Sequence, residues 1–235
     1  MRTHPNVPLS SIAMIMGSVL CFSTLDSIVK TLAPHYPIAL LVWARWAVQT
    51  VALLIWWGPQ MRGRLLATRQ LPVQLFRGVV LVGSSIAFMT ALKYLPLGEA
   101  TALNYSTPVI VTLMAALFLH ERLNRASIGF VLAGVAGMLL IVRPGGAVFQ
   151  GAALLALASA ICYSIFQILT RTVVNDDPRV SLFYPALVGT ALATLLLPFI
   201  DVPHDVRWFD IALLVCGALV GACGHFMFIL AFRHG

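Results

Sequence analysis

Long apolar runs separated by short polar connections make up most of the chain. Each run is close to the roughly 20 residues that a helix needs to cross a bilayer, and none shows the every-second-residue alternation of a barrel strand. The pattern therefore predicts an all-α integral membrane protein with eight transmembrane helices. The predicted helices cover about residues 9–32, 37–57, 73–93, 98–119, 126–142, 150–170, 180–200 and 209–232.

Composition supports a membrane protein and argues against several other classes. Hydrophobic residues make up 60% of the chain and charged residues 10%, against roughly 25% charged residues in soluble domains. The net charge of +7 comes from basic residues scattered between the apolar runs, so we expect no nucleic-acid partner. The four cysteines lie inside apolar runs without a CxxC pair, so we expect packing roles and no metal or disulfide role. They are Cys21, Cys162, Cys216 and Cys223. We also expect no cofactor.

The distribution of arginine and lysine predicts the topology. With a cytoplasmic N-terminus, ten basic residues fall on the cytoplasmic side, four fall outside and Arg45 lies within the membrane, in agreement with the positive-inside rule. The inside set comprises Arg2, Arg62, Arg64, Arg69, Arg77, Arg122, Arg125, Arg171, Arg179 and Arg233. The outside set comprises Lys30, Lys93, Arg143 and Arg207.

Two charged residues lie deep inside the first two runs. Asp26 is eight residues before a turn at Pro34 to Pro37, and Arg45 is eight residues after it. At 1.5 Å per residue, both lie roughly 12 Å from the turn, at one depth in a hydrocarbon core about 30 Å thick. A charge at that depth is costly unless it is paired or faces a water-filled cavity, so we expect Asp26 and Arg45 to be partners at a functional site.

Other arrangements of these charges are also consistent with the sequence. One helical stripe that could line a path carries Ser23, Asp26, Ser27 and Lys30. Lys30 could pair with Asp26 and leave Arg45 free for a ligand carboxylate or phosphate, or the Asp26–Arg45 pair could simply hold two helices together. Asp26 could also exchange a proton and couple proton movement to transport, although a close arginine would favour its ionised form.

The fourth run carries a second polar face. Four residues have the spacing i, i+3, i+4 and i+7, which predicts that they share one side of a helix: Thr101, Asn104, Tyr105 and Pro108. Pro108 removes a backbone hydrogen bond and frees a carbonyl, which protein, side chains or water must satisfy. These residues could form a cavity wall with a hinge, or a kinked helix that binds its neighbours.

The chain repeats itself at a separation of about 140 residues. Ser18-Val-Leu-Cys-Phe-Ser23 matches Ser159-Ala-Ile-Cys-Tyr-Ser164 at a separation of 141, and Phe88 to Lys93 resembles Phe228 to Arg233 at 140. A repeat of five helices reverses its orientation in the second copy, which is the inverted-repeat plan of many transporters. We expect a first repeat at 8–145 and an incomplete second repeat at 150–235, which lacks two of an expected ten helices.

The second repeat supplies three weaker candidates for a solute pathway. Tyr163 and Gln167 could form its share of a cavity wall. His225 could face the cavity or act as a hydrogen-bonded packing residue.

Several motifs resemble the EamA family of the drug/metabolite transporter superfamily. They are Ala91-Leu-Lys-Tyr-Leu-Pro-Leu-Gly-Glu-Ala-Thr-Ala-Leu-Asn-Tyr-Ser-Thr-Pro108, Leu119-His-Glu-Arg122, Val142-Arg-Pro-Gly145 and Ala231-Phe-Arg233. The resemblance covers nearly the whole chain. It implies ten helices in two inverted repeats, a place in the bacterial inner membrane, and export of small metabolites such as amino acids or their derivatives. The chain departs from the family pattern by ending after the eighth predicted helix.

Two functions agree with these patterns. The first is a secondary transporter that exports or exchanges small metabolites by alternating access, with the lipid bilayer and a small-molecule substrate as partners and a proton as a candidate coupling ion. The second is a non-transporting helical membrane protein, either a truncated remnant or a subunit that needs a partner. The sequence contains no HExxH, GxSxG or Walker loop, so we do not expect an enzyme.

Overall fold

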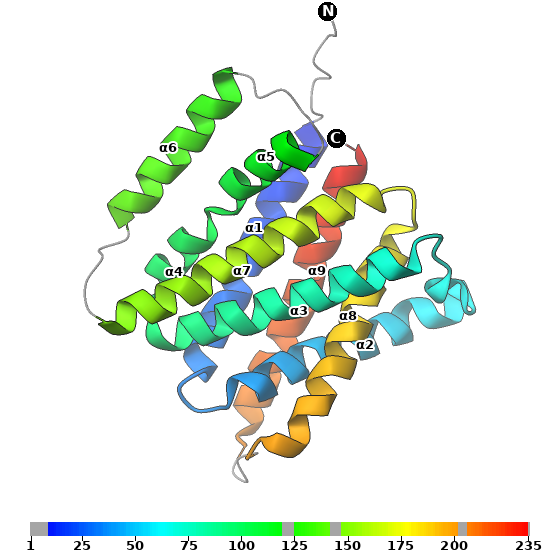
Figure 1. Ribbon diagram of the computed structural model, residues 1–235. Helices are drawn as coiled ribbons and strands as arrows, with labels where there is room; N and C mark the ends of the chain where they lie inside the picture. The colour runs from blue at the N-terminus through cyan, green and yellow to red at the C-terminus, as the bar shows by residue number, and fades with distance from the viewer. Residues whose placement is uncertain (1–8, 119–124, 142–146, 202–205, 235) are drawn as a thin grey trace, which may run out of the picture.

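The structure of the protein, a computed structural model, describes residues 9–118, 125–141, 147–201 and 206–234. Helices account for most of these residues and no strand occurs among them, so the predicted all-α class is confirmed (Figure 1). In chain order the elements are α1 (Leu9–Leu32), α2 (Ile38–Met61), η1 (Arg64–Leu66), α3 (Leu71–Tyr94), α4 (Leu97–Asn104), α5 (Thr107–Phe118), α6 (Arg125–Ile141), α7 (Ala147–Thr172), α8 (Pro178–Leu196), η2 (Leu197–Phe199) and α9 (Trp208–His234).

Seven of the predicted spans are long and apolar enough in the structure to cross a membrane. They are α1, α2, α3, α4 together with α5, most of α7, α8 with η2, and most of α9. The remaining helix, α6, has 17 residues. At 1.5 Å per residue it rises about 26 Å, which is short of a hydrocarbon core about 30 Å thick. The predicted count of eight spans is therefore not confirmed for the described residues.

Helices that are far apart in the chain pack together. α1 packs mainly along α9 and α3 mainly along α7, while α2 lies against α8 (Figure 1). α4 and α5 lie against α7, and α6 contacts the bundle mainly through α4 and α5. The interior is therefore built largely by contacts between the first three helices and the last three.

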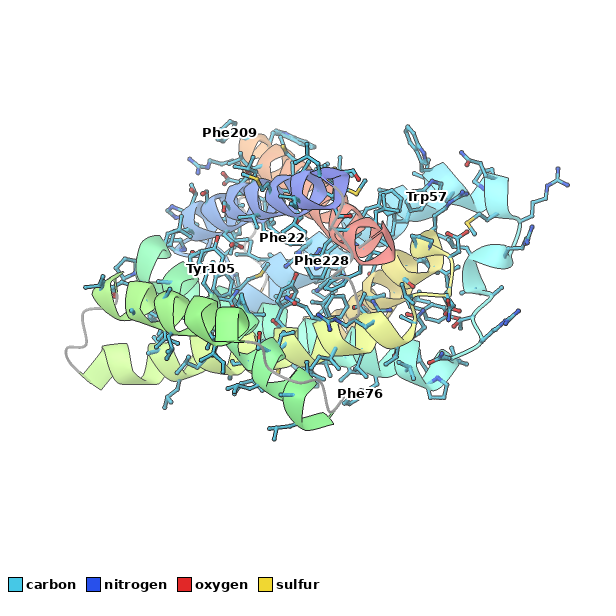
Figure 2. The ribbon with its side chains drawn as sticks, turned by 90° about the horizontal axis from the view of Figure 1, so that it is seen from above. Phe22, Trp57, Phe76, Tyr105, Phe209 and Phe228 are labelled. Carbon is cyan, nitrogen blue, oxygen red and sulfur yellow. The ribbon has the colours of Figure 1, made fainter. Side chains whose placement is uncertain are left out.

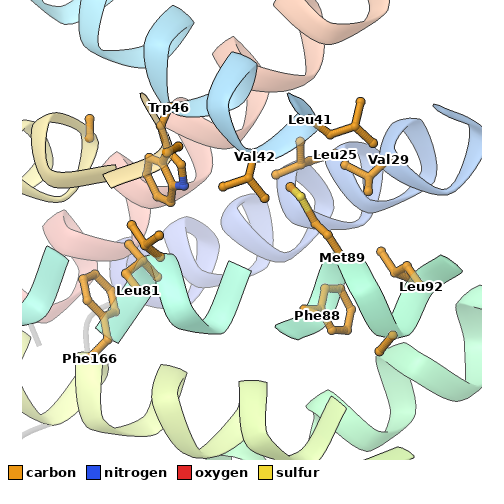
Figure 3. Packing of buried hydrophobic residues seen from close by; sticks show 14 of the residues in the cluster. Leu25, Val29, Leu41, Val42, Trp46, Leu81, Phe88, Met89, Leu92 and Phe166 are labelled. Carbon is orange, nitrogen blue, oxygen red and sulfur yellow. The ribbon is translucent and has the colours of Figure 1, made fainter. Parts of the chain in front are cut away.

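Close approach of α8 to its neighbours depends on two glycines. Trp46 of α2 and Phe166 of α7 fill the interior with large, fully buried rings (Figure 3). A Cβ atom on Gly189 of α8 would lie 2.6 Å from the Trp46 ring, and one on Gly78 of α3 would lie 2.6 Å from Val188 of α8. Any larger residue at these two positions would force the Trp46 or Val188 side chain to shift.

The fourth predicted helix is interrupted, which corrects the prediction of one continuous polar face. α4 ends at Asn104 and α5 begins at Thr107, so Thr101 and Asn104 lie on one helix and Pro108 on the next. Pro108 lies in the first turn of α5, where its missing N–H costs little. Thr107 Oγ1 donates to the Asn104 carbonyl at 2.7 Å. This carbonyl is four residues before Pro108, so a side chain satisfies the acceptor that the proline frees.

Replacing Gly189 by alanine is expected to lower the free energy of unfolding by about 1–3 kcal/mol, because the added methyl group would overlap the rigid Trp46 ring. Gly83→Ala in α3 is the matched control, since a Cβ there would meet nothing within 4 Å. Alanine also favours a helix interior over glycine by about 1 kcal/mol. Melting temperatures in detergent should therefore fall for Gly189→Ala and hold or rise for Gly83→Ala. Equal melting temperatures would contradict the close contact of α2 with α8.

Candidate functional site

Asp26 and Arg45 lie at a similar depth in the bundle. Asp26 is six residues before the end of α1 and Arg45 is seven residues after the start of α2, or roughly 9 and 10 Å from the α1–α2 turn. Arg45 is buried and Asp26 is half-buried. They are close enough to attract one another electrostatically. The ion pairs among the described residues do not include them, however, so the predicted direct pairing is not formed.

The Arg45 guanidinium points toward α3 and the adjacent indole ring instead. Its Nη1 lies 3.4 Å from Ser85 Oγ, and its central carbon lies 4.8 Å from the centre of the Trp46 ring. The buried Nε has no hydrogen-bond partner among the described residues. Gly221 of α9 lies beside this atom, where an added Cβ would be 3.9 Å from Nε. Arg45 therefore keeps a donor for an anion or for water.

Lys30 has a structural role at the end of α3. Its Nζ donates to the carbonyls of Leu92 and Leu95 at 2.6 and 2.7 Å. These carbonyls belong to the last turn of α3 and its C-cap, where a cation also interacts favourably with the helix dipole. The alternative in which Lys30 pairs with Asp26 is therefore wrong, because the ammonium group is held on the α3 terminus.

His225 and Tyr163 bring two further buried polar groups to the interior. His225 Nδ1 lies 3.0 Å from the Gly221 carbonyl, while its Nε2 has no partner among the described residues. The Tyr163 hydroxyl is likewise buried without a described partner. The His225 ring packs edge-on against Phe22, with ring centres 4.7 Å apart. Seen from above, Phe22 and Phe228 lie within the bundle (Figure 2).

The other predicted pathway residues are divided between the interior and the surface. Thr101, Asn104 and Gln167 are half-buried, and Asn104 Oδ1 is a buried atom with no described partner. By contrast, three of these residues are exposed at the surface: Ser23, Tyr105 and Pro108. The interior group therefore comprises Asp26, Arg45, Thr101, Asn104, Tyr163, Gln167 and His225.

Arg77, which the topology prediction counts among the cytoplasmic basic residues, is not a surface charge. Its side chain is fully buried in α3, where Nη1 donates to Gln74 Oε1 and Nη2 donates to Thr170 Oγ1 at 3.0 Å. Its central carbon lies 4.9 Å from the centre of the Phe166 ring. The sequence held one signal for this burial, because Arg77 lies inside an apolar run with Gln74 one turn before it.

A polar contact joins the α1–α2 turn to the start of α9. The Tyr36 hydroxyl donates to Asp210 Oδ2 at 2.7 Å, and Arg207 binds both carboxylate oxygens of Asp210. The hydrogen bond with Asp210 raises the pKa of the Tyr36 hydroxyl above its usual value. We call this group, Tyr36, Arg207 and Asp210, the α1–α2 clasp.

A second polar contact joins the α7–α8 turn to the start of α3. Asp176 Oδ2 accepts hydrogen bonds from Thr68 Oγ1 and from Gln74 Nε2, the latter at 2.9 Å. Gln74 Nε2 also lies 3.3 Å from Ser181 Oγ, and Gln74 Oε1 accepts from Arg77. We call the group of Thr68, Gln74, Asp176 and Ser181 the α7–α8 clasp.

These groups could recognise a charged solute without a metal ion. Arg45 offers donors to an anion, while Asp26 offers a carboxylate to a cation. Tyr163, His225 and Asn104 add neutral polar groups beside aromatic walls. In the described part of the chain, no three His, Cys, Asp or Glu residues group closely enough to hold a metal.

Comparison with known proteins supports a transporter. Residues 9–143 match the EamA-like transporter family. The pseudopaline exporter CntI of Pseudomonas aeruginosa is 28% identical over 96% of this chain and 79% of that protein. An uncharacterized transporter of Helicobacter pylori is 25% identical over 97% of this chain and 80% of that protein. A solved crystal structure, 23% identical, has the same fold with a TM-score of 0.74 and covers 95% of this chain and 79% of that one. This protein therefore belongs to the EamA-like transporter family and is a multi-pass membrane protein.

Proposed function

We propose that the protein is a secondary transporter of small zwitterionic metabolites, most simply amino acids or their derivatives. The observation that carries this proposal is the set of charged and polar groups in the bundle interior without full hydrogen bonding, above all Arg45 Nε near Asp26. Ionisable side chains at such depth are costly and mark solute or ion pathways in membrane proteins. In a chain of this family, a solute that brings its own charges is the simplest partner for these groups.

The substrate class rests on the two charges of the interior. The forked donors of Arg45 suit a carboxylate, and the Asp26 carboxylate suits an ammonium group. Relatives include the S-adenosylmethionine uptake transporter of Rickettsia bellii and the riboflavin transporter of Brucella anthropi, each matched over little more than half of this chain. Together with the pseudopaline exporter, they support transport of organic metabolites, with export or uptake according to the protein.

Transport would proceed by alternating access between two inverted repeats, at 8–145 and 150–235. Thr50 and Thr190, 140 residues apart, share a hydrogen bond at 2.8 Å between α2 and α8. α1 and α7 end at Leu32 and Thr172, and α2 and α8 begin at Ile38 and Pro178, again 140 residues apart. If α1 corresponds to α7 and α3 to α9, the packing of α1 on α9 has its counterpart in the packing of α7 on α3. These relations support a pseudo-two-fold axis near the Thr50–Thr190 contact.

The two clasps have the positions expected of alternating gates. The α1–α2 clasp joins the first hairpin to α9, and the α7–α8 clasp joins the corresponding second hairpin to α3. With the N-terminus in the cytoplasm of a bacterium, the first clasp would close the outer side of the inner membrane and the second the cytoplasmic side. Opening one clasp while the other stays closed would expose the interior to one side at a time. A proton carried by Asp26 is the simplest coupling ion for this cycle.

Solute counterflow in proteoliposomes tests the proposal. Asp26→Asn and Arg45→Ala are each expected to lower exchange at least about tenfold, since each removes a charge that binds the solute. The matched controls Asp201→Asn and Arg64→Ala alter exposed residues and should leave exchange unchanged. The solutes are labelled amino acids, S-adenosylmethionine and riboflavin. Correctly inserted wild-type protein that exchanges none of them would favour a non-transporting membrane protein.

Thiol accessibility tests the gates. With the four native cysteines replaced by serine, Ser85→Cys would report access to the Arg45 site from either side of the membrane. Tyr36→Phe should raise labelling from the outer side about tenfold, because the clasp loses a charge-assisted hydrogen bond. Asp176→Asn should raise labelling from the cytoplasmic side instead. The control Tyr94→Phe changes an exposed tyrosine. Opening to the same side in both clasp variants would contradict alternating access.

A further inference from the structure

Arg77 is a buried cation whose charge is not matched by a direct carboxylate contact. Its guanidinium has neutral acceptors in Gln74 and Thr170, and Nε has no hydrogen-bond partner among the described residues. The described ion pairs join Arg179 to Asp177 and Arg207 to Asp210 and leave Arg77 out. Asp176 attracts Arg77 electrostatically without a direct contact, and Gln74 forms hydrogen bonds with both side chains.

Such an arrangement is unfavourable for stability alone. Moving a guanidinium out of water carries a large desolvation penalty, which neutral acceptors recover only in part. Replacing a whole buried ion pair by well-packed hydrophobic side chains is often neutral or stabilising. A role in packing would thus be met as well by an uncharged residue at position 77. An anion that visits the site would supply the direct contact with a negative charge that Arg77 lacks.

A continuous series of aromatic contacts links Arg77 to Arg45. The Arg45 guanidinium lies over Trp46, whose ring centre is 6.3 Å from that of His225. The His225 ring centre is 6.2 Å from that of Phe166, and the Arg77 guanidinium lies over Phe166. Both guanidinium groups are close enough to His225 to act on it electrostatically. Trp46 and Phe166 appear together in the close view of the interior (Figure 3).

The two arginines lie near opposite ends of the bundle. Arg45 is seven residues from the start of α2, which lies at the α1–α2 turn. Arg77 is six residues from the start of α3, where the α7–α8 clasp also lies. Each is roughly 9 to 10 Å from its own end. A solute that crosses between the two ends would therefore meet Arg45 on one side of His225 and Arg77 on the other.

We propose that Arg77 is a second binding site for the anionic group of the transported solute, a carboxylate or phosphate that passes between Arg45 and Arg77 beside His225. The proposal rests on the proposed transport function and names a site in its pathway. Nε and a terminal nitrogen of one guanidinium can bind two oxygens of an oxyanion side by side. Nε is the donor left without a described partner on both arginines.

Anion-dependent thermal stability tests this site without any transport measurement. Purified protein in lipid nanodiscs is titrated with sodium succinate, with sodium chloride at matched ionic strength as the blank. A ligand that binds only the folded protein raises the melting temperature in a saturable way. We expect this rise in the wild type and, because Arg77 remains, in Arg45→Gln. The double variant Arg45→Gln/Arg77→Gln should lose it, while Arg45→Gln/Arg64→Gln should keep it, because Arg64 is exposed.

The charge-preserving variant keeps the test decisive if the double variant fails to fold. Arg45→Gln/Arg77→Lys retains a cation without the fork, and its half-saturating succinate concentration should rise about tenfold relative to Arg45→Gln. An undiminished rise in Arg45→Gln/Arg77→Gln would overturn the proposal, as would an unchanged half-saturating concentration in Arg45→Gln/Arg77→Lys. The absence of a saturable rise in both the wild type and Arg45→Gln would also overturn it. Failure of the transport proposal is separate, because succinate binding at Arg77 without solute counterflow would leave the anion site intact.

Discussion

The need of every buried polar group for a partner governs this structure, because a membrane interior offers little water to replace a missing hydrogen bond. Some groups meet this condition within one segment and others between helices. Thr107 satisfies the carbonyl that Pro108 frees, and Lys30 satisfies the carbonyls at the end of α3. Among the described residues, the groups that do not meet it include Arg45 Nε, His225 Nε2 and Arg77 Nε. In the proposed function, these three groups would bind the solute, whereas Thr107 and Lys30 stabilise the bundle.

The packing between the halves of the chain explains how such a site can be both rigid and movable. Gly189 allows α8 to lie directly against the Trp46 ring, so α2 and α8 form a tight central contact. The clasps, in contrast, are hydrogen bonds between a turn and a helix start at either end of the bundle. A few polar contacts of this kind can be exchanged at modest cost, whereas an interdigitated core cannot. In the proposed cycle, the two ends of the bundle would therefore move while the contact between α2 and α8 stays unchanged.

In the proposed function, the interior would suit a solute with charges better than an apolar one. Aromatic rings supply much of its wall, and cation–π contacts help to keep two guanidinium groups in an apolar setting. Asp26 adds the opposite charge near Arg45. A zwitterion would meet both signs of charge, and its carboxylate would move between the guanidinium groups of Arg45 and Arg77.

The sequence by itself determined the class of the protein, the limits of most spans, the similar depth of Asp26 and Arg45, and the carbonyl freed by Pro108. All of these follow from position along a single helix, because rise per residue and backbone chemistry need no neighbour. Only the tertiary structure decided that Lys30 binds α3, that Arg77 is buried, and that Arg45 points to Ser85 and Trp46 instead of pairing directly with Asp26. Helical spacing gives the depth of a side chain but not which neighbouring helix it faces. That choice depends on helix rotation and packing between residues more than a hundred positions apart, such as Trp46 and Gly189.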